Sequence, residues 1–178
     1  MSNLKQKVLL VDEHDNPVGE STVLEAHEGK GKRHRAISVF LFNHEGKLLI
    51  QQRSEKKIVG ALQWGNTCCG NVMPNETLET CAMRRLQEEL GITKTKLKEF
   101  YTFEYHVQCN EQFSEWEMDH IFVGKFDGNP KLNFDEVLQT RWILLKDLKK
   151  EMKDQLRIFS PWLEIILEDG KVGKYASN

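Results

Sequence analysis

The sequence predicts a single domain of the α+β class. Short apolar runs bounded by turn-forming residues indicate β-strands, and one longer segment has the periodicity of an amphipathic helix. No internal repeat, low-complexity tract or linker divides the 178 residues, a length that suits one hydrophobic core. Apolar residues make up 39% of the chain and charged residues 29%, the balance of a soluble globular protein rather than a disordered one. We therefore expect one domain over residues 1–178, with its core at about 8–168.

Several segments have the composition of β-strands and are bounded by turn residues. They cover residues 7–11, 18–24, 37–42, 47–52, 99–107, 118–126 and 140–145. The stretch 12–17 contains Asn16-Pro17 and is expected to turn the chain between the first two strands. The stretch Asn43-His44-Glu45-Gly46 has the turn chemistry of a β-hairpin.

The strongest helical signal covers residues 76–90. Its apolar residues can share one helical face, with charged residues elsewhere: Leu78, Cys81, Ala82, Leu86 and Leu90. Gly91 follows directly, as expected at the C-terminal end of a helix. Shorter helices are expected at 145–152 and 161–167, and we expect the tail 171–178 to be frayed.

The charge and the cysteines exclude several classes of function. A net charge of −2 gives no basic field for nucleic acid, so an anionic ligand must be held by a local cluster of cations. No apolar run approaches the ~18 residues of a membrane helix, and residues 1–7 lack the apolar segment of a signal peptide. The four cysteines form no CxxC pair, and Cys68 and Cys69 are adjacent, which suits free thiols. We expect a cytoplasmic protein without nucleic-acid or membrane partners.

A motif of many fixed positions lies in the middle of the chain. From Gly70 to Ile92 the sequence reads GNVMPNETLETCAMRRLQEELGI. It resembles the Nudix box, G-x5-E-x7-R-E-U-x-E-E-x-G-U with U aliphatic, at every fixed position except Arg85, where the pattern has Glu. A solvated amphipathic helix with i,i+4 pairs such as Arg85–Glu89 would explain the charges but not the matching glycines.

The resemblance implies a Nudix fold, in which a mixed β-sheet is sandwiched between helices. A loop followed by a helix places several carboxylates on one helix side, where they can hold Mg²⁺ and so neutralise a diphosphate. Glu88 and Glu89 point about 100° apart on such a helix and need not serve the same ion.

From about Val8 to Trp162, the chain also resembles the type 1 isopentenyl-diphosphate isomerases of this superfamily. Arg84 and Arg85 resemble the arginine pair that these isomerases carry on the helix of the motif. Other segments are similar to isomerase motifs: His27 and His34 before a strand, the loop 66–70 with Cys69, the segment 114–119 and the segment 159–162.

The reaction implied by this resemblance is a 1,3-allylic proton shift that interconverts isopentenyl diphosphate and dimethylallyl diphosphate. Such a shift needs two proton carriers and a dry pocket that does not quench a carbocation. Cys69 and Glu117 would be these carriers, with Tyr105 assisting Glu117. The aromatic face of Trp162 would stabilise the cationic intermediate.

The resemblance also implies two metals and a small-molecule diphosphate as the partner. The diphosphate would be bound by Arg53, Lys57 and Arg84, and by a Mg²⁺ ion held on Glu89. A second divalent metal, Mn²⁺ or Zn²⁺, would be bound by His27, His34, Glu115 and Glu117, with Asn71 as a weaker ligand. The expected assembly is a monomer or a homodimer.

Two departures from the family leave other functions open. Asn71 stands where the isomerases have a metal-binding histidine, and Val23 stands near a lysine that reaches the diphosphate. The alternative is a diverged Nudix hydrolase that cleaves a nucleoside or prenyl diphosphate with three carboxylates, Glu76, Glu88 and Glu89. A catalytically inactive binding module would fit Asn71 but not the retained Cys69, Glu117 and Trp162.

Overall fold

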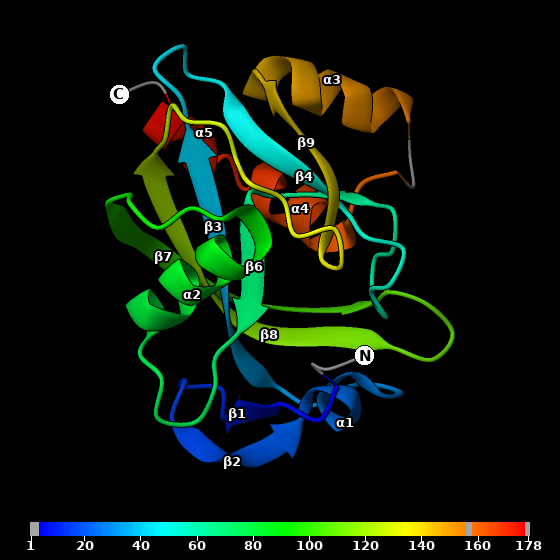
Figure 1. Ribbon diagram of the computed structural model, residues 1–178. Helices are drawn as coiled ribbons and strands as arrows, with labels where there is room; N and C mark the ends of the chain where they lie inside the picture. Colours follow the sequence, from blue (N-terminus) through cyan, green and yellow to red (C-terminus); the bar gives the residue numbers. More distant parts are fainter. Residues whose placement is uncertain (1–3, 156–157, 177–178) are drawn as a thin grey trace.

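The computed structural model describes residues 4–155 and 158–176. In this part of the chain, nine strands form one mixed sheet with five helices around it (Figure 1). The strands are β1 (Lys7–Val11), β2 (Pro17–Thr22), β3 (His34–Phe42), β4 (Leu48–Arg53), β5 (Trp64–Gly65), β6 (Cys68–Asn71), β7 (Leu97–Gln108), β8 (Ser114–Lys125) and β9 (Val137–Ile143). The helices are α1 (Val23–His27), α2 (Leu78–Leu90), α3 (Leu145–Asp154), α4 (Pro161–Glu168) and α5 (Lys171–Ala176). None of the described helices is long and apolar enough to cross a membrane.

The sheet is organised around β3, which brings distant parts of the sequence together. β3 pairs in parallel with β8, starting from His34 opposite Glu117, and antiparallel with β6, where Ser38 lies opposite Cys69. β7 pairs antiparallel with β8, with Tyr105 opposite Glu117. The first half of β3 therefore lies beside the strands that carry the predicted cysteine and glutamate, and the predicted tyrosine lies on the next strand, β7.

Alternate residues of β3 pack on opposite faces of the sheet, as the strand period requires. Val39 and Leu41 belong to the apolar cluster that includes the buried face of α2. Phe40 and Phe42 belong to the cluster on the other face, which is covered by α4 and α5. Figure 1 shows α2 on one side of the sheet and α4 on the other, so the prediction of a mixed sheet between helices is confirmed.

The helix of the motif lies where the sequence predicts it, within two residues. Thr77 caps the N-terminus of α2 through its side chain, and Gly91 ends the helix in the left-handed conformation with φ of 64°. The buried face of α2 includes two charged residues, Arg85 and Glu89. A Cβ atom at Gly70 would lie 2.5 Å from Cγ of Arg85, so only glycine lets β6 approach the helix here.

A short helix replaces part of an expected strand near the N-terminus. Residues 18–24 were expected to be extended, but β2 ends at Thr22. Thr22 and Glu25 form a capping box that begins α1, with each side chain accepting a hydrogen bond from the other residue's backbone. The helix ends at His27 and so places this imidazole at the sheet.

The expectation of a frayed tail is wrong for residues 171–176, which form α5. Val172 is fully buried, and the ring of Tyr175 lies 5.8 Å from that of Phe42 and 6.1 Å from that of Phe100. Apolar burial of these two side chains holds a helix too short to be stable alone. The core therefore extends beyond residue 168, and residues 177–178 lie outside the described residues.

Candidate active site

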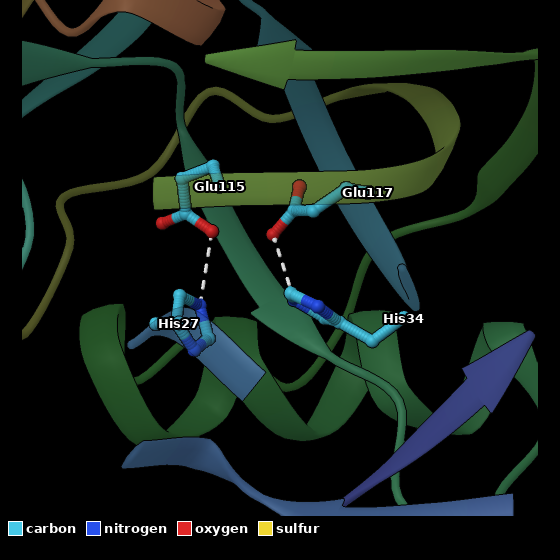
Figure 2. A group of neighbouring side chains, drawn as sticks. All are labelled: His27, His34, Glu115 and Glu117. Carbon is cyan, nitrogen blue, oxygen red and sulfur yellow. Dashed lines mark ion pairs between the residues drawn. The ribbon is translucent and has the colours of Figure 1, made fainter. Parts of the chain in front are cut away.

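Two histidines and two glutamates converge where β3 and β8 begin (Figure 2). His27 comes from the end of α1, His34 from the start of β3, and Glu115 and Glu117 from the same face of β8. Nε2 of His27 lies 2.9 Å from Oε2 of Glu115, and Nε2 of His34 lies 3.5 Å from Oε1 of Glu117. All four side chains are buried, and one ligand atom from each lies within 4.8 Å of the others.

The backbone fixes which nitrogen each histidine presents to the carboxylates. Nδ1 of His27 lies 2.6 Å from the carbonyl oxygen of Val23, and Nδ1 of His34 lies 2.8 Å from that of Lys32. Each Nδ1 therefore donates to the backbone and each Nε2 faces the cluster, the arrangement seen for metal-binding histidines. Nε2 of His34 is buried without a hydrogen-bond partner among the described residues. This orphaned nitrogen, together with the two carboxylates, fits a divalent transition metal.

His27 and Glu115 stabilise each other's charged forms. Burial lowers the pKa of His27, but the carboxylates of Glu115 and Glu117 outweigh burial and raise that pKa to about 9. The charge and hydrogen bond of His27 in turn lower the pKa of Glu115, although burial alone would raise it. A proton on His27 is therefore held where a metal would bind, and it must leave when a metal does so.

A cavity of about 110 Å³ lies beside the cluster. The wall combines three members of the cluster with residues of β6 and with basic side chains. The wall includes His27, Glu115, Glu117, Cys69, Asn71, Arg53, Lys57, Arg84 and Arg85. The cavity thus brings a thiol, a carboxylate and several cations within reach of one small ligand.

Cys69 enters this cavity from β6, opposite Ser38 of β3. Burial raises the pKa of its thiol to about 12, although the guanidinium of Arg53 acts in the opposite direction. The thiol is therefore protonated at neutral pH. Nη1 of Arg53 lies 3.6 Å from Sγ, close enough to stabilise a thiolate once the proton has left.

Glu117 contacts both the cavity and the histidines. Its Oε2 accepts a hydrogen bond of 2.6 Å from the hydroxyl of Tyr105, and its Oε1 faces His34. Burial and the charge of Glu115 raise the pKa of Glu117, while His34 and Tyr105 lower it. Tyr105 is 7% exposed, so its hydroxyl orients the carboxylate without competition from bulk water.

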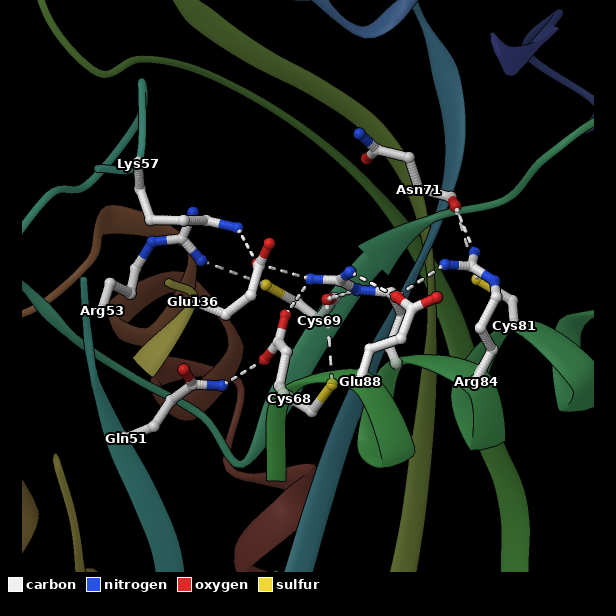
Figure 3. A network of polar contacts seen from close by, with 12 residues as sticks. Gln51, Arg53, Lys57, Cys68, Cys69, Asn71, Cys81, Arg84, Glu88 and Glu136 are labelled. Atoms are coloured by element: carbon white, nitrogen blue, oxygen red, sulfur yellow. Dashed lines mark hydrogen bonds and ion pairs between the residues drawn. The ribbon is translucent and has the colours of Figure 1, made fainter. Parts of the chain in front are cut away.

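Arg85, the residue that departs from the Nudix pattern, is buried among three carboxylates, and Figure 3 labels two of them, Glu88 and Glu136. Nη1 lies 2.7 Å from Oε2 of Glu88, while Nη2 contacts Glu89 and lies 3.0 Å from Oε2 of Glu136. The second oxygen of Glu89 accepts a hydrogen bond of 2.6 Å from Nε2 of Gln51. The carboxylate of Glu89 is therefore fully engaged and does not line the cavity.

Two of the cations predicted to bind a diphosphate are also paired with carboxylates. Nε of Arg84 lies 2.6 Å from Oε1 of Glu76, and Nζ of Lys57 lies 2.7 Å from Oε2 of Glu136. Arg53 differs, because no carboxylate of the described residues lies within 4.0 Å of its guanidinium. It binds the carbonyl oxygen of Val59 through Nε and Nη2.

Trp162 holds Arg53 in place rather than forming the cavity wall. The guanidinium of Arg53 lies over the indole ring, 5.0 Å from its centroid, and the indole Nε1 donates a hydrogen bond of 3.3 Å to Oδ1 of Asn66. The ring is 2% exposed. Cation–π attraction at a buried site of this kind fixes the position of Arg53 beside Cys69.

Residues 32–163 match the model of the NUDIX domain family. Among curated proteins, the "Isopentenyl-diphosphate Delta-isomerase 2" of Photorhabdus laumondii is 39% identical over 160 residues, which cover 90% of this chain and 89% of the relative. The "Isopentenyl-diphosphate Delta-isomerase" of Nocardia farcinica is 39% identical over 162 residues, 90% of this chain and 92% of the relative. The chain belongs to the isopentenyl-diphosphate Delta-isomerases of the NUDIX family. Both the Nudix fold and the isomerase resemblance inferred from the sequence are thereby confirmed.

Solved structures share the fold of this isomerase-family chain at low sequence identity. A protein from Deinococcus radiodurans superimposes with a TM-score of 0.75 at 19% identity, over 92% of this chain and 98% of that one. A MutT NUDIX hydrolase from Burkholderia pseudomallei superimposes with a TM-score of 0.61 at 20% identity, over 77% of this chain and 97% of that one. At such identities the likeness shows the fold alone.

Most side chains that the isomerase motifs single out surround the cavity. The cavity wall includes three cluster residues, His27, Glu115 and Glu117, together with Cys69, Arg53, Lys57 and Arg84. The fourth cluster residue, His34, lies behind the wall and contacts Glu117. Asn71 and Val23, the two departures from the isomerase pattern, also line the wall. The roles assigned to these residues stay predictions.

Two features of the site were not predicted from the sequence. Arg85 was recognised as part of the arginine pair of the isomerases and as an i,i+4 partner of Glu89, but not as a residue that also binds Glu88 and Glu136. Glu136 gave no signal, because it lies on the loop before β9, far from any motif. Only the fold places it beside Lys57 and Arg85.

Proposed function

We propose that this chain interconverts isopentenyl diphosphate and dimethylallyl diphosphate, the substrate class for which its relatives are named. One observation carries the proposal: Cys69 and Glu117 line the same cavity. One is a protonated thiol and the other a carboxylate held by Tyr105. An acid and a base that face one small ligand are what a proton shift requires.

Cys69 acts as the acid in the forward direction. Its thiol donates a proton to the terminal carbon of the alkene, which leaves positive charge on the tertiary carbon. The thiolate that remains is stabilised by the guanidinium of Arg53 at 3.6 Å from Sγ. Glu117 then removes a proton from the carbon on the diphosphate side, with the Tyr105 hydrogen bond fixing the direction of its carboxylate.

The cations of the cavity wall bind the diphosphate. We also propose two metal ions, one at the histidine–glutamate cluster and one at the diphosphate. His27, His34, Glu115 and Glu117 would hold Mn²⁺ or Zn²⁺, and Asn71, which lines the same cavity, would be a weaker ligand. A divalent ion there supplies positive charge that keeps the buried carboxylates ionised. A Mg²⁺ ion would accompany the diphosphate. Glu89, its ligand expected from the sequence, would have to give up its contact with Arg85 or Gln51 to reach such an ion.

Hydrolysis is the less supported alternative. In the hydrolase pattern a glutamate occupies position 85, whereas here Arg85 pairs with Glu88 and Glu89. Glu76 is likewise paired with Arg84. The carboxylates that a hydrolase uses for catalytic metal are therefore occupied by guanidinium groups.

The test is NMR of the purified protein with isopentenyl diphosphate in D₂O, with Mg²⁺ and either Mn²⁺ or Zn²⁺. Proton and phosphorus spectra are followed together. Dimethylallyl diphosphate carrying deuterium is the expected product. Release of phosphate without a double-bond shift would replace the proposal with hydrolysis.

A further inference from the structure

Glu136 places a negative charge inside the group of cations that face the cavity (Figure 3). One oxygen, Oε2, lies 2.7 Å from Nζ of Lys57 and 3.0 Å from Nη2 of Arg85. The side chain of Glu136 is 15% exposed. Burial raises its pKa, but the two cations outweigh burial and hold that pKa well below its ordinary range. The group is therefore a carboxylate at any physiological pH.

The chain holds Glu136 in this position from both sides. The amide of Ser54 donates a hydrogen bond of 3.0 Å to the carbonyl oxygen of Glu136, which ties it to the loop that carries Lys57. Asn133 accepts from the amide of Glu136 at 2.9 Å and donates to the carbonyl oxygen of Glu89 at 3.0 Å. The backbone of Glu136 is thus fixed between the end of α2 and the loop after β4, and its ion pairs with Lys57 and Arg85 hold the carboxylate in place.

As a result, Lys57 and Arg85 have little positive charge left for a free anion. Lys57 and Arg85 share Glu136, and Arg85 also contacts Glu88 and Glu89. A free diphosphate would approach the fixed carboxylate of Glu136 and be repelled by it. A diphosphate that carries Mg²⁺ has lost most of its negative charge and can instead use both the cations and the carboxylates.

We propose that Glu136 determines specificity in the diphosphate subsite, by making it select the magnesium complex of a diphosphate over the free anion. The inference rests on the proposed function only in taking a diphosphate as the ligand. At an effective dielectric constant of about 20, one unit charge several ångströms away changes a binding constant by more than about tenfold. Removing the charge of Glu136 while keeping its shape therefore strengthens binding of the free anion selectively.

The experiment measures the dissociation constant of inorganic pyrophosphate by calorimetry, with saturating Mg²⁺ and with EDTA. The wild type is compared with Glu136→Gln, which keeps an oxygen for Lys57 or Arg85 but loses the charge. Asp135→Asn is the matched control, because this adjacent carboxylate pairs with Lys56 on the surface, at 73% side-chain exposure. The ratio of the two dissociation constants is the readout, since a merely structural role would change both constants together.

We expect the wild type and Asp135→Asn to bind the magnesium complex at least about tenfold more tightly than the free anion. The ratio should shrink by about tenfold or more in Glu136→Gln. A ratio unchanged by Glu136→Gln, or a wild type that binds both forms equally, would overturn the inference. Thermal unfolding checks that each variant is folded, and Glu136→Ser carries the same prediction if the glutamine variant is not. A wild type that binds pyrophosphate selectively yet never isomerises isopentenyl diphosphate would refute the proposed function alone.

Discussion

Replacing Gly70 by alanine tests how the first residue of the motif supports the buried arginine. The added Cβ would lie 2.5 Å from Cγ and 2.8 Å from Cδ of Arg85, well inside contact distance. These are the inner atoms of the side chain, so Arg85 as a whole must move. Its ion pairs with Glu88, Glu89 and Glu136 are then strained or lost.

The expected cost follows from the burial of this arginine. Breaking a buried ion pair typically costs about 3–5 kcal/mol, and Arg85 has 8% side-chain exposure. Taking about 3 kcal/mol for a partial displacement, and about 2–4 °C per kcal/mol for a chain of this size, the melting temperature should fall by about 6–12 °C. Urea and thermal unfolding followed by circular dichroism measure both quantities.

Gly173→Ala is the matched control, since among the described residues an added Cβ there meets only Cδ1 of Leu145 at 4.0 Å. Within helix α5 this change should leave stability unchanged or raise it slightly. Gly70→Ala made in an Arg85→Ala background should add little further loss, because the clash is gone. Equal stability of Gly70→Ala and wild type, or full additivity of the two changes, would refute the reasoning.

Three further predictions concern the proton carriers, pH and the metal. Cys69→Ala and Glu117→Gln should each abolish isomerisation in the NMR assay while remaining folded; near-wild-type rates in either would remove that residue from the mechanism. The pKa of Glu136 is lowered from its ordinary 4.5 to about 2, so its stabilisation is present above pH 4.5 and is lost as pH falls through that window. The stability difference between wild type and Glu136→Gln should therefore shrink by about 1.4 kcal/mol per pH unit below pH 4.5, as measured by urea unfolding, and a constant difference would contradict the assigned shift. Asn71→His adds an imidazole to the cavity wall and should raise affinity for Zn²⁺ by about tenfold or more in a competition with a chelator; unchanged affinity would place residue 71 outside the metal site.

Local patterns predicted the parts of the fold that local physics determines. The apolar spacing of residues 76–90 predicted α2, and the composition of residues 118–126 predicted most of β8. The capping box at Thr22 and Glu25 was a readable signal for α1 that the strand interpretation overlooked. The helix at 171–176 had no such signal, because tertiary burial of Val172 and not local propensity stabilises it.

The candidate site was predictable only where a motif names the residue. His27, His34 and Cys69 could be selected because each lies beside residues similar to a known pattern. The contact of Arg85 with Glu136 could not be predicted, since it joins residues 51 positions apart through a loop without a motif. Charges inside a pocket are balanced by whatever side chain the fold brings near, and sequence spacing does not contain that information.

The parallel pairing of β3 with β8 has a consequence for how the protein would acquire the proposed metal. His34 lies opposite Glu117, so the two ligands meet only when strands 83 residues apart have found the native register. A slip of one residue would turn Glu115 and Glu117 to the other face of the sheet and leave the histidines without their carboxylates. Long-range pairing of this kind forms late in folding. Metal uptake should thus follow completion of the sheet, and a refolding chain would acquire its ion in the slowest kinetic phase.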